Sequence, residues 1–117
     1  MQKVIFMLNA SPYGSERVLT ALRLALALAD SENKPDLHIF LLSDAVVTAK
    51  AGQSVATGAT LGEMLQDLLA SGAEIKVCKT CAVARGLGES DLIAGIGIGT
   101  MPELAALTLS ADKLLTF

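Results

Sequence analysis

The only two cysteines of the chain form a C-x-x-C pair, Cys78 and Cys81. They directly follow residues 73–77 (AEIKV), which are predicted to form a strand. Three cations lie nearby in the sequence: Lys76, Lys79 and Arg85. Positive charge near a thiol favours the thiolate, which is the nucleophilic form of cysteine. The spacing therefore makes Cys78 a candidate reactive thiolate, with Cys81 as an assisting second thiol.

Other sites that use cysteine fit the chain less well. Structural zinc takes about four ligands, but there is no second cysteine pair, and the single histidine, His38, lies in a predicted strand. A phosphatase-like loop has the pattern C-x5-R, whereas Arg85 follows neither cysteine at that spacing. We therefore expect no metal site. A thioredoxin-type redox pair and a buried, inert Cys78 remain open alternatives.

The glycine-rich segment at residues 95–100 (GIGIGT) fails the dinucleotide pattern G-x-G-x-x-G, because Thr100 takes the place of the last glycine. It also lies late in the chain, so a turn with a short strand is the better interpretation. There is no P-loop, and the first loop offers only Tyr13 to stack on a flavin. We expect no cofactor.

Composition excludes several classes of protein. The net charge of -3 and the pI near 5.0 argue against a nucleic-acid binder. The mean hydropathy is +0.55, yet no apolar run approaches the ~20 residues that span a bilayer. Hydrophobic residues make up 52% of the chain, above the roughly 45–50% of typical domains, so we expect a homo-oligomer that covers apolar surface. Since no signal peptide is recognisable, we expect a cytoplasmic protein with reduced cysteines.

The elements that must position the cysteines alternate between strands and helices. A continuous apolar run with β-branched and aromatic residues predicts a strand at residues 3–8. Further strands are predicted at residues 36–42, 73–77, near Ile96 and Ile98, and at 113–117. Helices are predicted at residues 17–29, 43–49, 61–70, within 82–99, and at about 101–109. Two capping-box patterns, Thr60 with Glu63 and Thr100 with Glu103, open the third and the last of these helices. Residues 50–58 are predicted to be flexible.

This alternation predicts one α/β domain over residues 1–117, with a doubly wound, mainly parallel five-stranded sheet and helices on both faces. We expect the flavodoxin-like strand order 2-1-3-4-5, in which the first and third strands are neighbours. The loop at residues 9–14 would then face Cys78 across a crevice, with residues 50–58 as a lid. The candidate binding residues around this crevice are Asn9, Ser11, Tyr13, Gly14, Lys79 and Arg85.

Four segments in order resemble the DsrE/DsrF-like family, in particular its small single-domain members. They are residues 10–16 (ASPYGSE), 40–46 (FLLSDAV), 77–81 (VCKTC) and 109–117 (LSADKLLTF). The resemblance implies a doubly wound sheet and a trimeric or hexameric homo-oligomer. It also implies that Cys78 matches a cysteine that carries persulfide sulfur between partner proteins.

Together these features favour a sulfur-carrier or sulfurtransferase-like protein that relays persulfide sulfur on Cys78 between donor and acceptor proteins. Two alternatives remain. One is a non-catalytic homo-oligomer that binds a small ligand, in which the cysteines are incidental. The other is a thiol redox protein that uses Cys78 and Cys81 as a dithiol pair.

Overall fold

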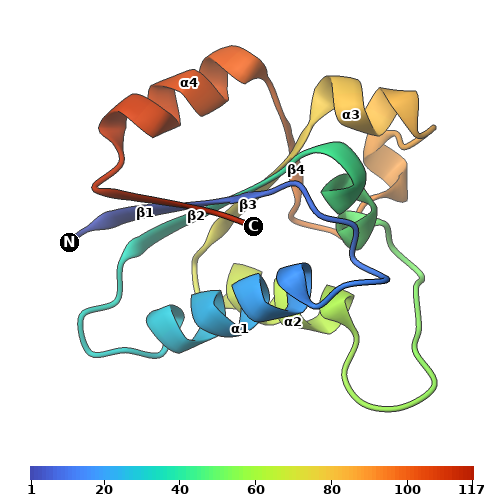
Figure 1. The fold of residues 1–117 in the computed structure, drawn as a ribbon, viewed down its shortest axis with the longest axis horizontal. Helices are drawn as coiled ribbons and strands as arrows, with labels where there is room; N and C mark the ends of the chain where they lie inside the picture. Colours follow the sequence, from blue (N-terminus) through green and yellow to red (C-terminus); the bar gives the residue numbers. More distant parts are fainter.

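Five parallel strands form one sheet with helices on both of its faces (Figure 1). The computed structural model describes residues 1–117. Its strands are β1 (Lys3–Leu8), β2 (Asp36–Leu41), β3 (Glu74–Cys78), β4 (Gly97–Gly99) and β5 (Lys113–Thr116). Each lies within a residue or so of its predicted position. The signal is plainest for β1, which is apolar almost throughout, as is typical of strands covered on both faces.

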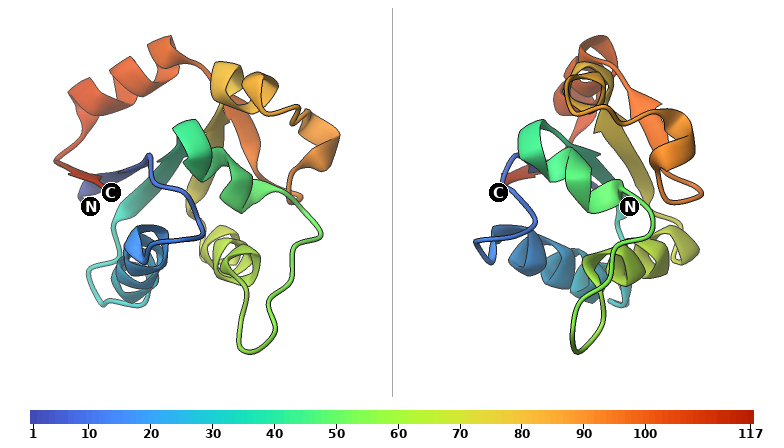
Figure 2. Two further views of the ribbon diagram at one scale, coloured as in Figure 1. Left: turned by 45° about the vertical axis from the view of Figure 1, so that its right-hand side comes forward. Right: turned by 90° about the vertical axis from the view of Figure 1, so that its right-hand side faces the viewer.

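Two long helices, α1 (Arg17–Ala29) and α2 (Leu61–Ala70), lie on one face, and α4 (Met101–Ser110) lies on the other (Figure 2). Three short helices complete the fold: η1 (Ser43–Ala49), α3 (Lys79–Ala84) and η2 (Glu89–Asp91). Of the two predicted capping boxes, that of Thr60 and Glu63 closes completely, whereas at Thr100 only the hydroxyl cap forms. The Thr60 hydroxyl accepts a hydrogen bond from the Glu63 amide at 3.0 Å, and the Thr100 hydroxyl accepts one from the Glu103 amide at 3.4 Å. No helix is long and apolar enough to cross a membrane.

The strand order is β4-β3-β2-β1-β5, so the expected order 2-1-3-4-5 is wrong. Strand β2 lies between β1 and β3 and pairs with both, Phe40 standing beside Met7 on one side and Lys76 on the other. A right-handed crossover can place the next strand on either side of the last, with its helix on the corresponding face. The sequence alone therefore did not fix on which side of β1 the third strand would be added.

From β1 to β4 each new strand is added on the same side of the sheet, and only β5 is added at the other edge, beside β1. For that reason α4, which connects β4 to β5, covers the face opposite to α1 and α2. The strands on the two sides of the boundary between β1 and β5 are reached by connections on opposite faces. Ligands of open α/β sheets commonly bind at such a switch point. There the Asn9 amide donates a 2.8 Å hydrogen bond to the Phe117 carbonyl. Cys78, at the end of β3, is two strands away from this point.

Buried side chains form two clusters, one on each side of the sheet. The larger fills the space between the sheet, α1 and α2. The smaller contains four buried residues of the face that carries α4: Phe40, Leu42, Cys78 and Leu104. The candidate nucleophile therefore belongs to the minor core, on the face that a single long helix covers.

Candidate functional site

Cys78 occupies the junction between a strand and a helix. It is the last residue of β3 and the N-cap of α3, with an extended backbone (φ -62°, ψ 123°) that lets the chain pass directly from strand into helix. Its predicted place at the carboxyl end of a strand is confirmed. Cys81 is the third residue of α3, which begins immediately after Cys78 and so ahead of the helix predicted within residues 82–99.

The Cys78 side chain is only 3% exposed. Leu104 of α4 is buried in the same cluster, and three partly buried residues pack against it: Met7, Cys81 and Leu107. Neither cysteine lines any of five surface cavities of about 350–670 Å³. A reagent or partner can therefore reach the Cys78 sulfur only when the side chains that cover it move.

Polar groups from the first turn of α3 surround the Cys78 sulfur. The Thr80 hydroxyl lies 3.3 Å from Sγ, and the amides of Thr80 and Cys81 face it without closing a formal capping hydrogen bond. Burial raises the pKa of the Cys78 thiol, but the side chains of Cys81 and Thr80 and their two amides outweigh it, so that the pKa lies below the ordinary cysteine value. The site thus stabilises the thiolate relative to that of an ordinary cysteine.

The cations expected to activate Cys78 are engaged elsewhere. Lys76 Nζ lies 2.7 Å from a carboxylate oxygen of Glu103 and 3.3 Å from one of Glu74, and hydrogen bonding to Glu103 raises the pKa of Lys76. Lys79 is exposed at the start of α3. The hydrogen bonds of α3, and not neighbouring positive charge, therefore lower the thiol pKa, which corrects the interpretation drawn from the sequence.

Arg85 is tied to the second cysteine. Its Nε and Nη2 atoms lie 3.1 Å and 2.8 Å from Oδ1 of Asp44, which belongs to η1, and its Nη1 atom donates to the Cys81 carbonyl at 3.0 Å. This clamp fixes α3 against η1. Arg85 thus lies near the cysteines, where it binds the Cys81 carbonyl and links α3 to Asp44.

We predict that Thr80→Val raises the pKa of Cys78, because valine keeps the shape of threonine but removes the hydroxyl beside the sulfur. A hydrogen bond of ordinary strength corresponds to roughly half to one pH unit. The midpoint of the pH profile for iodoacetamide alkylation of Cys78 should move upward by about that amount, and the rate at neutral pH should fall. Thr80→Ser, which keeps the hydroxyl, should retain the native midpoint.

The first loop packs away from the cysteines. Tyr13 is half exposed and its hydroxyl donates to Oε1 of Gln53 at 2.5 Å, while the Ser11 hydroxyl accepts from the Tyr13 amide at 3.3 Å. Gly14 has a φ of +86° that favours glycine. Asn9 lines a cavity of about 360 Å³ beside β5. Because β2 separates β1 from β3, the prediction that this loop faces Cys78 across a crevice between neighbouring strands is wrong.

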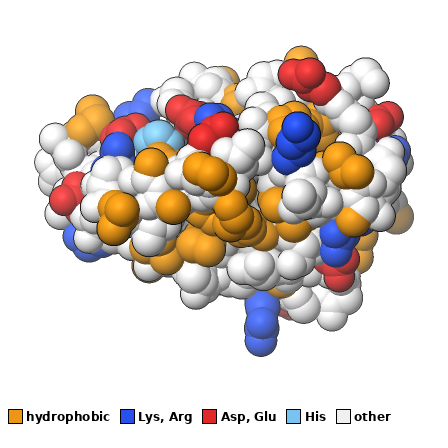
Figure 3. All heavy atoms as spheres, turned by 90° about the horizontal axis from the view of Figure 1, so that it is seen from above, with side chains coloured by type: hydrophobic (Ala, Val, Ile, Leu, Met, Phe, Trp, Pro, Cys, Tyr) orange, Lys and Arg blue, Asp and Glu red, His pale blue; other side chains and the backbone are white.

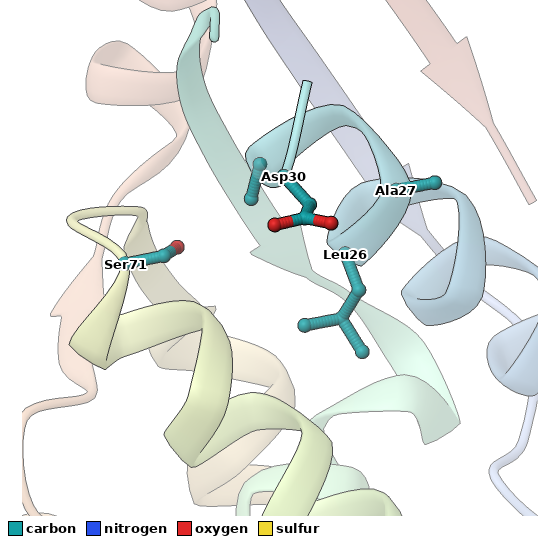
Figure 4. A pocket seen from close by; sticks show the side chains of 5 residues that line it. Leu26, Ala27, Asp30 and Ser71 are labelled. Atoms are coloured by element: carbon teal, nitrogen blue, oxygen red, sulfur yellow. The ribbon is translucent and has the colours of Figure 1, made fainter. Parts of the chain in front are cut away.

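The remaining cavities lie apart from Cys78. Residues 50–54 line one of about 380 Å³ with the start of α2 and Ile93, so the proposed lid borders α2. Another, of about 440 Å³, lies where α1 and α2 end, with Leu26, Asp30 and Ser71 around it (Figure 4). No group of three or more His, Cys, Asp or Glu side chains is arranged to hold a metal ion.

Three residues near the cysteines were not anticipated from the sequence: Thr80, Asp44 and Leu104. Thr80 stands inside the C-x-x-C pair, so its contact with Cys78 could have been inferred once a helix was placed there. Asp44 and Leu104 are 34 and 26 positions from Cys78 in the sequence. Only the arrangement of the strands brings them to the site, and no local pattern signals it.

A sequence model described as the DsrE/DsrF-like family matches residues 2–117. The chain belongs to this family. Among curated relatives, Protein YchN of Escherichia coli (strain K12) is 48% identical over 117 residues, with both chains fully covered. An uncharacterized protein of Methanopyrus kandleri is 37% identical over 115 residues, which span 97% of this chain and 93% of that protein.

Solved structures agree with this assignment to the DsrE/DsrF-like family. The crystal structure of the YchN protein from Escherichia coli superimposes with a TM-score of 0.95 at 48% identity, over the full length of both chains. A protein of unknown function from Methanobacterium thermoautotrophicum superimposes with a TM-score of 0.83 at 16% identity, also over full length, and shares the fold. The resemblance seen in the sequence and the α/β fold class are thus confirmed.

Proposed function

We propose that this DsrE/DsrF-like protein is a sulfur carrier that holds persulfide sulfur on Cys78. The observation that supports the proposal most is the thiol at the carboxyl end of β3, where the first turn of α3 holds its pKa below the ordinary value. Membership of a family associated with sulfur relay points the same way. The donor and the acceptor would be proteins that, like this one, carry sulfur as a cysteine persulfide.

The proposed transfer needs no external oxidant. The Cys78 thiolate attacks the outer sulfur of a donor persulfide, the S–S bond of the donor breaks, and the donor leaves as a thiolate that takes up a proton. Cys78 then carries one additional sulfur, which a thiolate of the acceptor removes in the same manner. A nucleophilic thiolate and a docking surface are sufficient for this chemistry, so no metal or organic cofactor is part of the proposal.

The 3% exposure of Cys78 favours a second candidate, a non-catalytic homo-oligomer that binds a small ligand and whose cysteines are incidental. The face that carries α4 has the character expected of an interface between copies. Figure 3 shows hydrophobic side chains gathered across it, and Met101 and Leu109 are 53% and 89% exposed. A trimer or hexamer in the cytoplasm, where thiols remain reduced, is our proposal for both candidates.

Mass spectrometry of the intact protein distinguishes the two functions. We expect the reduced Cys81→Ser variant to gain the mass of one sulfur atom when exposed to an alkyl persulfide, with peptide mapping placing it on Cys78. Cys78→Ser should abolish this gain. If the sulfur fails to add to Cys78 while the protein stays folded, the carrier proposal is wrong, and a search for small-molecule ligands becomes the next step.

A further inference from the structure

Cys81 is a nucleophile beside Cys78 that simple sulfur transfer does not use. It is the third residue of α3, whereas Cys78 is the N-cap. At this spacing an N-cap side chain reaches the third helical residue, as in a capping box. Cys81 is partly buried and packs against the cluster that contains Cys78. The two sulfur atoms therefore stand on the same side of the first turn.

The backbone of Cys81 is held in place from outside the helix. Its carbonyl accepts the 3.0 Å hydrogen bond from Arg85, and Arg85 is anchored in turn by two contacts to Asp44 on η1. A short helix of six residues would otherwise open easily. The clamp acts through the backbone of Cys81 and leaves its sulfur beside Cys78, whose pKa the Cys81 side chain helps to lower.

We propose that Cys81 resolves the persulfide on Cys78 and releases its outer sulfur as sulfide. The inference rests on the proposed function, since it starts from Cys78 loaded with sulfur. The Cys81 sulfur attacks Sγ of Cys78, the bond between Sγ and the outer sulfur breaks, and HS⁻ leaves. A disulfide between Cys78 and Cys81 forms, and the thiol proton of Cys81 passes to the departing sulfide.

The electrons balance within the pair. The Cys81 sulfur is oxidised to the disulfide level, and the outer sulfur of the persulfide is reduced to sulfide, so no other oxidant takes part. Attack on the inner sulfur is favoured because α3 places Cys81 next to Sγ, whereas the outer sulfur extends beyond it. A dithiol reductant returns the protein to its starting state. Sulfur that no acceptor collects is thus discharged as sulfide.

The test follows free sulfide and intact mass together after one equivalent of an alkyl persulfide is added to the full-length reduced protein, with donor alone as the blank. We expect the wild-type chain to release about one equivalent of sulfide and to lose two hydrogens through a bond between Cys78 and Cys81. Cys81→Ser should keep one added sulfur on Cys78 and release no sulfide above the blank. Cys81→Ala, without a polar replacement atom, should behave in the same way.

The outcomes separate the two proposals. If wild-type protein keeps the added sulfur without sulfide release, while Cys81→Ser also loads, the carrier stands and the resolving role of Cys81 is overturned. Sulfide release that persists in both Cys81 variants overturns that role too. If neither Cys81 variant acquires sulfur on Cys78, the proposed carrier function itself fails, and the resolving step fails with it.

Discussion

Gly99→Ala is expected to destabilise the protein by about 1–3 kcal/mol, the usual effect of adding a methyl group where no space exists. A Cβ atom at Gly99 would lie 2.7 Å from two ring carbons of Phe40 and 3.3 Å from Cβ of Lys76. Phe40 is 1% exposed within the small cluster that contains Cys78, so its ring has no free space into which it can move.

The neighbouring glycine of the same strand is the matched control. At Gly97 an added Cβ would lie 3.7 Å from Cγ of Lys76, an ordinary contact, and its φ is not positive. Gly97→Ala should therefore be neutral or stabilising by up to about 1 kcal/mol, because alanine has fewer unfolded conformations than glycine. Urea or thermal unfolding measures both effects. Equal stability of the two variants would contradict the tight packing at Gly99.

A second substitution tests the cause of the effect at Gly99. Phe40→Leu shortens the side chain that an alanine at this position would meet, so the double variant should be more stable than the sum of the two single changes indicates. Coupling between residues in contact is commonly about 0.5–3 kcal/mol. Strict additivity would mean that the loss comes from the strand backbone and not from the ring.

Local patterns in the sequence were sufficient for the strands and the long helices, but not for the start of α3 at Lys79. The apolar run at Lys3–Leu8 and the capping pair of Thr60 and Glu63 mark a strand and a helix start through interactions between near neighbours. The same holds for the position of Cys78 at a strand end. Each of these features depends on residues only a few positions apart, which a single sequence displays directly.

Features that depend on the strand order could not be predicted from the sequence. A flavodoxin-like arrangement and the observed one use the same strands, but they differ in the placement of two of them: β3 lies beside β2 and not β1, and β5 lies beside β1 and not β4. That difference separates the first loop from Cys78. The role of Gly99 is of the same kind, since it is set by Phe40, a residue of β2, across β3. The glycine-rich segment alone indicated only a turn with a short strand.

Leu104→Ala is expected to speed the alkylation of Cys78 by about tenfold or more, because Leu104 is buried in the same cluster as the thiol. Truncation of a buried leucine costs about 2–5 kcal/mol. Leu104 lies in a small cluster near the surface, so we expect a value near the lower end. Each 1.4 kcal/mol taken from the closed state raises the open fraction about tenfold. The rate follows from timed iodoacetamide labelling under native conditions.

Two controls show whether α4 moves away from Cys78 by a local opening or only when the whole protein unfolds. Leu109→Ala removes a side chain of the same helix that is 89% exposed, so it should change neither the alkylation rate nor the stability of the isolated chain. Leu65→Ala makes a comparable hole in the larger cluster, on the opposite face of the sheet. If Leu65→Ala accelerates labelling as much as Leu104→Ala, Cys78 reacts only through global unfolding. If Leu104→Ala alone does so, α4 controls access to the sulfur, and a partner that displaces α4 could load Cys78 without unfolding the protein.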